Sequence, residues 1–173
     1  MNIFRVKRAF TLIELILVIL LTSSVYILMF SSSSFFVKNP KDKFLLENTK
    51  EFLMNNYEFE NKISLVCIED KFTCFVSIDE QINTKTKIEN VFVNTPEVYE
   101  YNKDRVQADF KSVRINDIEY DVIFRFEINK DFKIKEYILD TLENKVYVFN
   151  SIFQKAKVLG SLNEAFETFE KKI

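Results

Sequence analysis

The longest apolar run in the chain lies near its N-terminus, between residues 10 and 30. Only six positions in it carry polar or semi-polar side chains, namely Thr11, Glu14, Thr22, Ser23, Ser24 and Tyr26. In a helix, about 20 apolar residues are enough to cross the hydrocarbon core of a bilayer. The run therefore predicts a membrane-spanning helix over residues 10–30.

Three basic residues, Arg5, Lys7 and Arg8, closely precede this run. Positive charge beside a span stays on the cytoplasmic side, so we expect a single pass through the inner membrane with the C-terminal part in the periplasm. An ordinary signal peptide is an alternative, although its apolar region normally covers about 7–15 residues and ends at a small-x-small site. A second alternative is that residues 10–30 are an uncleaved membrane anchor without any further role.

A junction containing four serines and a proline, residues 31–40, separates the apolar run from the rest of the chain. Asn39 suits a helix cap and Pro40 suits the first helical position, so we expect a helix that restarts here and continues to about Tyr57. One face of this helix is mostly apolar and should lie against a sheet. Its members are Phe44, Leu45, Asn48, Phe52, Leu53 and Asn56.

From Lys62 onward, short apolar or alternating runs favour strands. Residues 63–68 and 73–78 predict a hairpin around a polar turn at 69–71, and 91–93 and 98–101 predict shorter pieces. Residues 118–128, 132–139 and 145–149 predict an antiparallel meander, with clear alternation over 122–128. Ser161 and Glu164 have the spacing of a capping box, which predicts a helix through about Glu170. The expected fold is α+β, with a periplasmic domain over residues 41–173.

Composition removes most familiar enzyme classes. The chain has no His and a single Gly, Gly160. It therefore lacks Ser-His and Cys-His nucleophile pairs, imidazole metal sites, and the glycine-rich loops of nucleotide-binding enzymes. Its formal net charge is −2, whereas a nucleic-acid-binding domain is expected to carry a positively charged surface.

The block Lys7-Arg8-Ala9-Phe10-Thr11-Leu12-Ile13-Glu14-Leu15-Ile16 carries the most specific signal. It resembles the leader and cleavage site of the type IV pilin and type II secretion pseudopilin superfamily. The resemblance implies a leader over residues 1–9, which a prepilin peptidase removes between Ala9 and Phe10 before methylating the new N-terminus at Phe10. It also implies a pilin-like fold with a long N-terminal helix. Ala9 departs from the glycine usual in the family, but it is also small.

Glu14 stands at the fifth position of the processed chain, where the family carries a glutamate. A carboxylate inside a span is costly and marks a functional site by default. Cleavage before Phe10 creates a cationic amine, and in a staggered stack this amine of one subunit can pair with Glu14 of its neighbour. Such a pair would set the axial register, so we assign Glu14 to assembly. The alternative is a glutamate that reaches the membrane interface as part of a plain anchor.

The two cysteines flank the turn of the first predicted hairpin. A two-residue turn at Asp70-Lys71 would place Cys67 directly opposite Cys74, within reach of a disulfide. The oxidising periplasm allows this bond. The alternative is two reduced, half-buried thiols. Metal binding is disfavoured, because two thiols without histidine supply too few ligands.

Two sets of charged residues give weaker signals. Four acidic residues could suggest a calcium site, but they lack the spacing of a calcium-binding loop. We therefore favour solvated surface charge for these residues, Asp104, Asp109, Asp117 and Asp121. Basic residues near aromatic ones could contact phosphates and stack on bases, although a mixed-charge sheet face is the favoured interpretation. They are Lys85, Lys87, Lys103, Arg105, Lys111 and Arg114, with Tyr99, Tyr101 and Phe110 nearby.

Together these features predict a structural subunit, a pseudopilin or minor pilin, rather than an enzyme, with no cofactor and no metal. The resemblance implies a prepilin peptidase, other pilin or pseudopilin subunits, an inner-membrane assembly platform and membrane lipid as partners. The machine could be a type II secretion pseudopilus, a type IV pilus or a competence pseudopilus for DNA uptake. The rival hypothesis is a membrane-tethered periplasmic binding module, which would need neither Glu14 nor the cleavage site.

Overall fold

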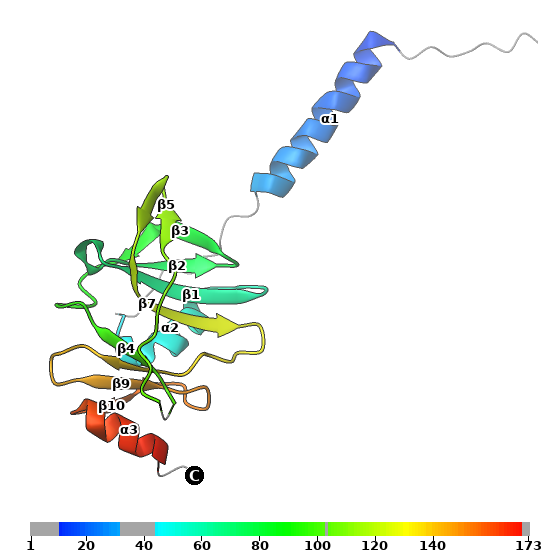
Figure 1. Ribbon diagram of the computed structural model, residues 1–173. Helices are drawn as coiled ribbons and strands as arrows, with labels where there is room; N and C mark the ends of the chain where they lie inside the picture. The colour runs from blue at the N-terminus through cyan, green and yellow to red at the C-terminus, as the bar shows by residue number, and fades with distance from the viewer. Residues whose placement is uncertain (1–10, 32–43, 103, 171–173) are drawn as a thin grey trace, which may run out of the picture. The chain divides into compact units, whose positions relative to one another are not determined.

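The computed structural model describes residues 11–31, 44–102 and 104–170 (Figure 1). The chain divides into two compact units, Met1–Phe36 and Val37–Ile173. The first contains helix α1, Leu12–Ser31. The second contains all the strands and the helices α2, Thr49–Asn56, and α3, Leu162–Glu170.

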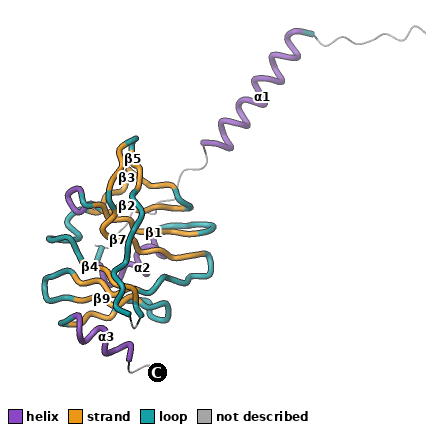
Figure 2. Tube along the Cα trace, in the orientation of Figure 1, coloured by secondary structure: helices purple, strands orange, loops and turns teal. Residues whose placement is uncertain are grey.

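The predicted α+β, pilin-like fold with a long membrane-spanning helix is wrong. The described chain is mostly β, with antiparallel sheets and short helices, as Figure 2 shows for the second unit. Over the residues that the structure describes, no helix combines the length and the apolar character needed to cross a membrane. Helix α1 starts at Leu12 rather than Phe10, and Glu14 and the hydroxyl residues Thr22 to Ser24 interrupt its apolar sequence.

The helix predicted from Pro40 to about Tyr57 is shorter than expected over the described residues. A 3₁₀ turn, η1 (Leu46–Asn48), leads into α2. Leu45 has extended backbone angles, so the helix cannot continue through it towards Pro40. Asn39 and Pro40, with the rest of residues 32–43, lie outside the described residues.

Two four-stranded sheets form the second unit. Sheet A has the order β3-β2-β1-β7, from Gln81–Ile88, Cys74–Ile78, Lys62–Ile68 and Val122–Asn129. Sheet B has the order β10-β9-β8-β4, from Lys157–Leu159, Val146–Phe149, Tyr137–Asp140 and Glu97–Glu100. A separate hairpin consists of β5, Val113–Ile115, and β6, Ile118–Tyr120.

The predicted meander is divided between the sheets. Its first segment, 118–128, splits into β6 and β7, and β7 pairs with β1 in sheet A. The other two segments become β8 and β9 in sheet B, where β8 starts at Tyr137 rather than Phe132. A single bridge, Ile128 to Ile134, connects β7 with the segment before β8. The predicted piece at 91–93 is not a strand, whereas β4 coincides closely with the predicted 98–101.

The main core lies between the two sheets and includes α2 (Figure 1). Alternation along β7 is confirmed, because Val122, Phe124, Phe126 and Ile128 are buried and the residues between them are half-buried. A second apolar cluster packs α3 on the other face of sheet B through Phe166. A third packs the β5–β6 hairpin on the other face of sheet A. Sheet A is consequently buried on both faces along much of β1 and β2.

Candidate functional site

Helix α1 carries the residues that the sequence assigned to assembly. Its sequence, rich in Leu and Ile and free of Gly and Pro, favours a continuous helix. The backbone N–H groups of Glu14 and Leu15 donate to the carbonyl of Thr11 at 3.0 and 3.3 Å, which fixes the first turn. Ala9 and Phe10, the predicted processing site, lie outside the described residues.

Over residues 12–26, the side chains of α1 are exposed on every face of the helix. Over residues 12–26 none is buried or half-buried, and the large apolar ones range from 47% exposed at Ile16 to 79% at Leu12. A surface helix normally has one apolar stripe and one polar face, whereas a helix that is apolar all round belongs in an apolar environment. Over residues 12–26, helix α1 therefore presents apolar surface in every direction.

Hydroxyl groups interrupt this apolar surface without requiring water. Thr22 Oγ1 donates to the carbonyls of Val18 and Ile19, both at 3.0 Å. Ser24 Oγ donates to the carbonyl of Leu21 at 2.8 Å. Because a hydrogen-bonded polar group can be buried at little cost, these side chains are compatible with a packed interface around α1.

Glu14 is the only charged residue in the sequence of α1. It is exposed and stands in the first turn, where the helix dipole stabilises a negative charge. A single carboxylate on an otherwise uncharged helix would be strongly selective for a cation if the surrounding surface were covered.

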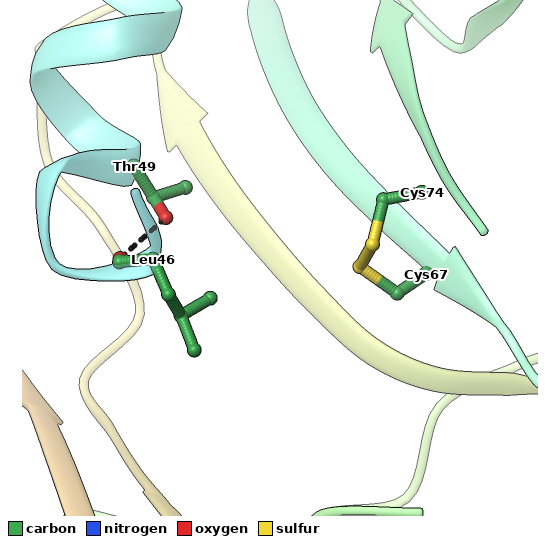
Figure 3. The surroundings of a disulfide bond; sticks show 4 residues. All are labelled: Leu46, Thr49, Cys67 and Cys74. Carbon is green, nitrogen blue, oxygen red and sulfur yellow. Dashed lines mark hydrogen bonds between the residues drawn. A yellow bond between two sulfur atoms is a disulfide. The ribbon is translucent and has the colours of Figure 1, made fainter. Parts of the chain in front are cut away.

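Cys67 and Cys74 form a disulfide at the turn between β1 and β2. They are directly opposite in the register, with sulfur atoms 1.99 Å and Cα atoms 3.9 Å apart. Both side chains are fully buried in the main core. Figure 3 shows the bond, and the same view includes the start of α2, where Thr49 Oγ1 donates to the carbonyl of Leu46 at 2.7 Å.

The turn that carries the disulfide is longer than the predicted two residues. Ile68 N–H donates to the carbonyl of Thr73 at 3.0 Å, so residues 69–72 form the turn. It contains a 3₁₀ segment, Asp70–Phe72, in which Lys71 and Phe72 have positive φ angles. Compared with the predicted turn at residues 70–71, the observed turn includes one more residue on each side, Glu69 and Phe72. Cys67 and Cys74 therefore remain directly opposite each other.

The acidic and basic residues singled out from the sequence are scattered over several elements. Lys85 and Lys87 lie on β3 of sheet A, and Arg114 lies on β5. Lys103 is outside the described residues. Within the described parts of the chain, no three side chains among Asp, Glu, Cys and His are grouped to hold a metal ion, so the four aspartates do not form a calcium site there.

The aromatic residues near these basic groups are half-buried, and two of them, Tyr99 and Phe110, pack against other rings of the protein. Phe110 makes an edge contact with Tyr137, and Tyr99 makes one with Phe166. Arg105 lies over the same Phe166 ring, 4.6 Å from its centre. The Tyr99 hydroxyl donates to Glu97 at 2.6 Å, which together with burial raises the pKa of Tyr99 to about 12. The rings of Tyr99 and Phe110, which would have to stack on bases in a nucleic-acid site, are thus already in contact with other aromatic rings of the protein.

The sequence reasoning missed a polar pocket of about 180 Å³ on the outer face of sheet A. Ser64, Ser77 and Arg125 line it, from β1, β2 and β7. The available signal was an arginine at an outward position of the alternating β7 sequence. The pairing of β7 with β1 was not predicted, however, and this pairing places Arg125 opposite Val66 and Glu127 opposite Ser64, so that both β7 side chains line the pocket.

The chain matches no protein-family model, and no characterised protein or solved structure shows significant similarity to it. Its function is therefore argued from its own residues: the processing block, helix α1 and the disulfide-bonded hairpin.

Proposed function

We propose that this chain is a structural filament subunit of the pseudopilin or minor-pilin kind, processed between Ala9 and Phe10 and assembled through α1. The resemblance of residues 7–16 to the prepilin processing segment motivates the proposal. The observation that carries it is the exposed apolar surface of α1 over residues 12–26, which has Glu14 as its one charge. Neither a catalytic step nor a cofactor is part of this function.

The occupant of the α1 surface is the corresponding helix of other subunits. Each large apolar side chain gains about 1.5–3 kcal/mol when it is transferred from water into a packed interior. The exposed leucines, isoleucines and valines of α1 would together supply a large favourable term for helix–helix packing. The internally bonded Thr22 and Ser24 hydroxyls would enter this packing without unpaired donors.

Glu14 gives the packing its register. Apolar contacts alone permit axial sliding, because neighbouring positions along α1 are chemically alike. The amine that cleavage creates at Phe10 supplies one cation per subunit, and a neighbour's Glu14 supplies its anion. Removing one member of a buried ion pair typically costs about 3–5 kcal/mol, which is enough to select one alignment.

The disulfide supports a location outside the cytoplasm for the second unit. Disulfides persist in oxidising compartments such as the bacterial periplasm and are rare in the cytosol. The proposal accordingly assigns residues 41–173 to the periplasmic side of the cell envelope. The prepilin peptidase and other pilin-like subunits are the partners that it requires.

Substitution of Glu14 tests the proposal. We expect Glu14→Leu to fold normally but to lose assembly, with subunit affinity lowered more than about 100-fold because the partner amine loses its counter-charge. Glu14→Gln, which keeps the shape without the charge, should show a similar but milder defect. Site-specific photo-crosslinking along α1 in cells measures assembly, and circular dichroism of the purified protein checks the fold.

Glu58→Gln is the matched control, because Glu58 is an exposed carboxylate on the second unit. It should assemble like the wild type. Normal crosslinking by both Glu14 variants would contradict the proposal and favour the tethered binding module instead. A defect of the same size in Glu58→Gln would contradict the special role of Glu14.

A further inference from the structure

A small pocket lies on the outer face of sheet A, beside β5 of the β5–β6 hairpin. Its volume is about 180 Å³, which is the space that about six waters occupy in the liquid at about 30 Å³ each. Three adjacent strands, β2, β1 and β7, contribute side chains to it, and Val113 of β5 contributes from the hairpin. The pocket is therefore part of the folded second unit and does not depend on α1.

Two serines form one part of its lining. Ser64 and Ser77 are directly opposite in the β1–β2 register, so their side chains project from the same face of the sheet. Each residue is only 7% exposed. A serine hydroxyl both donates and accepts hydrogen bonds, and this pair offers two such groups side by side at a nearly buried position.

Arg125, which also lines the pocket, has one unsatisfied donor. Its Nη2 donates to the carbonyl of Lys111 at 3.4 Å, near the long limit for a hydrogen bond. Its Nε is buried and has no hydrogen-bond partner. A buried donor without a partner costs about 1–3 kcal/mol, and more when the group is charged. The native fold thus maintains a guanidinium edge that a suitable acceptor would stabilise.

The two carboxylates that line the pocket, Glu80 and Glu127, lie near Lys62 rather than forming an ion pair with Arg125. Lys62 Nζ lies 2.8 Å from Glu80 and 4.0 Å from Glu127. The hydrogen bond to Glu80 raises the pKa of Lys62, and the nearby positive charge of Arg125 opposes this rise. Among the described residues, Arg125 has no carboxylate within 4.0 Å. Lys62 is therefore balanced by acidic neighbours, whereas Arg125 is not.

We infer that this pocket binds a small monocarboxylate, with its carboxylate on Arg125 and the two serine hydroxyls. A carboxylate accepts two parallel hydrogen bonds from a guanidinium and further bonds from hydroxyls. Val66, Ile82 and Val113 line the remainder of the pocket and suit a short alkyl chain. Glu80 and Glu127 also line the pocket, Glu127 directly opposite Ser64, and they would repel a dianion such as phosphate more strongly than a monoanion.

Titration of isotope-labelled full-length protein with propionate tests this inference, with propionamide as the neutral isostere. The sequence contains five arginines, so the Nε–H signals in a nitrogen–proton correlation spectrum are few and can be assigned by substitution. We expect saturable shifts of the Arg125 Nε–H and the Ser64 and Ser77 amides, with a millimolar dissociation constant. Propionamide and sodium chloride at equal concentration should produce no saturable shift.

Two variants make the assignment specific. Arg125→Gln should weaken propionate binding at least about tenfold, which corresponds to about 1.4 kcal/mol. Arg114→Gln, on β5, should leave it unchanged. If Arg125→Gln fails to fold, Ser64→Ala serves in its place and should weaken binding severalfold while Arg125 remains.

Three results would overturn the inference. The first is no saturable shift with propionate, and the second is equal shifts with propionamide. The third is tighter binding of inorganic phosphate than of propionate. Because none of these readouts involves Glu14 or assembly, failure here leaves the proposed filament function untouched.

Discussion

At the scale of single residues, Asp79 shows how one side chain connects separate segments of the second unit. It lies between β2 and β3 with φ of 47°, followed by Glu80 with φ of 73°. Its carboxylate accepts backbone N–H groups from Glu60 at 3.1 Å, Asn61 at 2.8 Å and Lys62 at 2.9 Å. The turn between β2 and β3 thereby holds the segment that leads into β1.

We expect Asp79→Ala to lower the free energy of unfolding by about 1–2 kcal/mol, at the low end for hydrogen bonds to a charged group because Asp79 is only partly buried. The N–H groups, that of Lys62 foremost, hold the pKa of Asp79 below its ordinary value. The stabilisation is therefore complete above the unfolded-state pKa, near 4, and is lost as pH falls through the folded-state pKa. Urea unfolding at pH 7 and below pH 3 measures both effects.

Asp131→Ala is the control for Asp79, since Asp131 is an exposed carboxylate in another turn. It should change stability little at either pH. The interpretation fails if the difference between Asp79→Ala and the wild type is as large below pH 3 as at pH 7.

At the scale of elements, the β1–β2 hairpin is held by both its ladder and its disulfide. Five residue pairs connect the strands, from Ile63–Ile78 to Cys67–Cys74. The disulfide closes a short loop, with a sequence separation of 7. In the chain-entropy model, stabilisation grows with loop length and reaches about 3 kcal/mol for a 15-residue loop. A smaller effect is expected here.

We therefore predict that replacing both Cys67 and Cys74 with alanine lowers the free energy of unfolding by less than about 3 kcal/mol. Urea unfolding measures this loss, and wild-type protein unfolded under reducing conditions should match the double variant. Alkylation under non-reducing denaturation provides the covalent check. Two freely labelled thiols in native protein, or equal stability of oxidised and reduced wild type, would refute a stabilising disulfide.

Strong local patterns made some elements predictable. Residues 63–68 and 73–78 are apolar runs on either side of a polar break, and β1 and β2 match them within a residue. Ser161 Oγ accepts from Glu164 N–H at 3.3 Å, as the capping-box prediction requires. The Glu164 side chain accepts from Gly160 N–H rather than from the cap residue itself, a difference of one position.

Other elements could not be read from local patterns. Strand β3 is mostly polar at an edge of sheet A, so its sequence resembles a loop. The turns beside the missed strands give no glycine signal, because the left-handed positions are filled by other residues such as Asp79 and Asn116. The helix predicted over residues 10–30 nearly coincides with α1, Leu12–Ser31, but its assignment as a membrane span was wrong, because Glu14 and residues 22–24 interrupt the apolar sequence.

At the scale of the whole molecule, strand partners are the information that the sequence did not reveal. Strand β7 pairs with β1, about 60 residues earlier in the sequence, rather than with β8, which follows it. Such non-local pairing depends on how the apolar faces of two sheets and α2 close one core. The same pairing creates the Arg125 pocket, which explains why that site was invisible in the sequence, whereas Glu14 in a first helical turn was visible.

The processing prediction also belongs to the whole molecule, because cleavage changes both its end and its charge. Removing residues 1–9 would take away Arg5, Lys7 and Arg8, leaving 21 basic against 26 acidic side chains. The mature chain would carry a new cation at Phe10, four positions before Glu14.

We expect protein extracted from cells with an active prepilin peptidase to begin at methylated Phe10, as measured by N-terminal sequencing and intact mass. In cells without the peptidase the same chain should begin at Met1, which is the control. A lysine at Ala9 should block cleavage, since the long charged side chain replaces a small one beside the scissile bond. An intact Met1 in peptidase-positive cells would remove the source of the amine that Glu14 is proposed to bind, and with it the assembly mechanism.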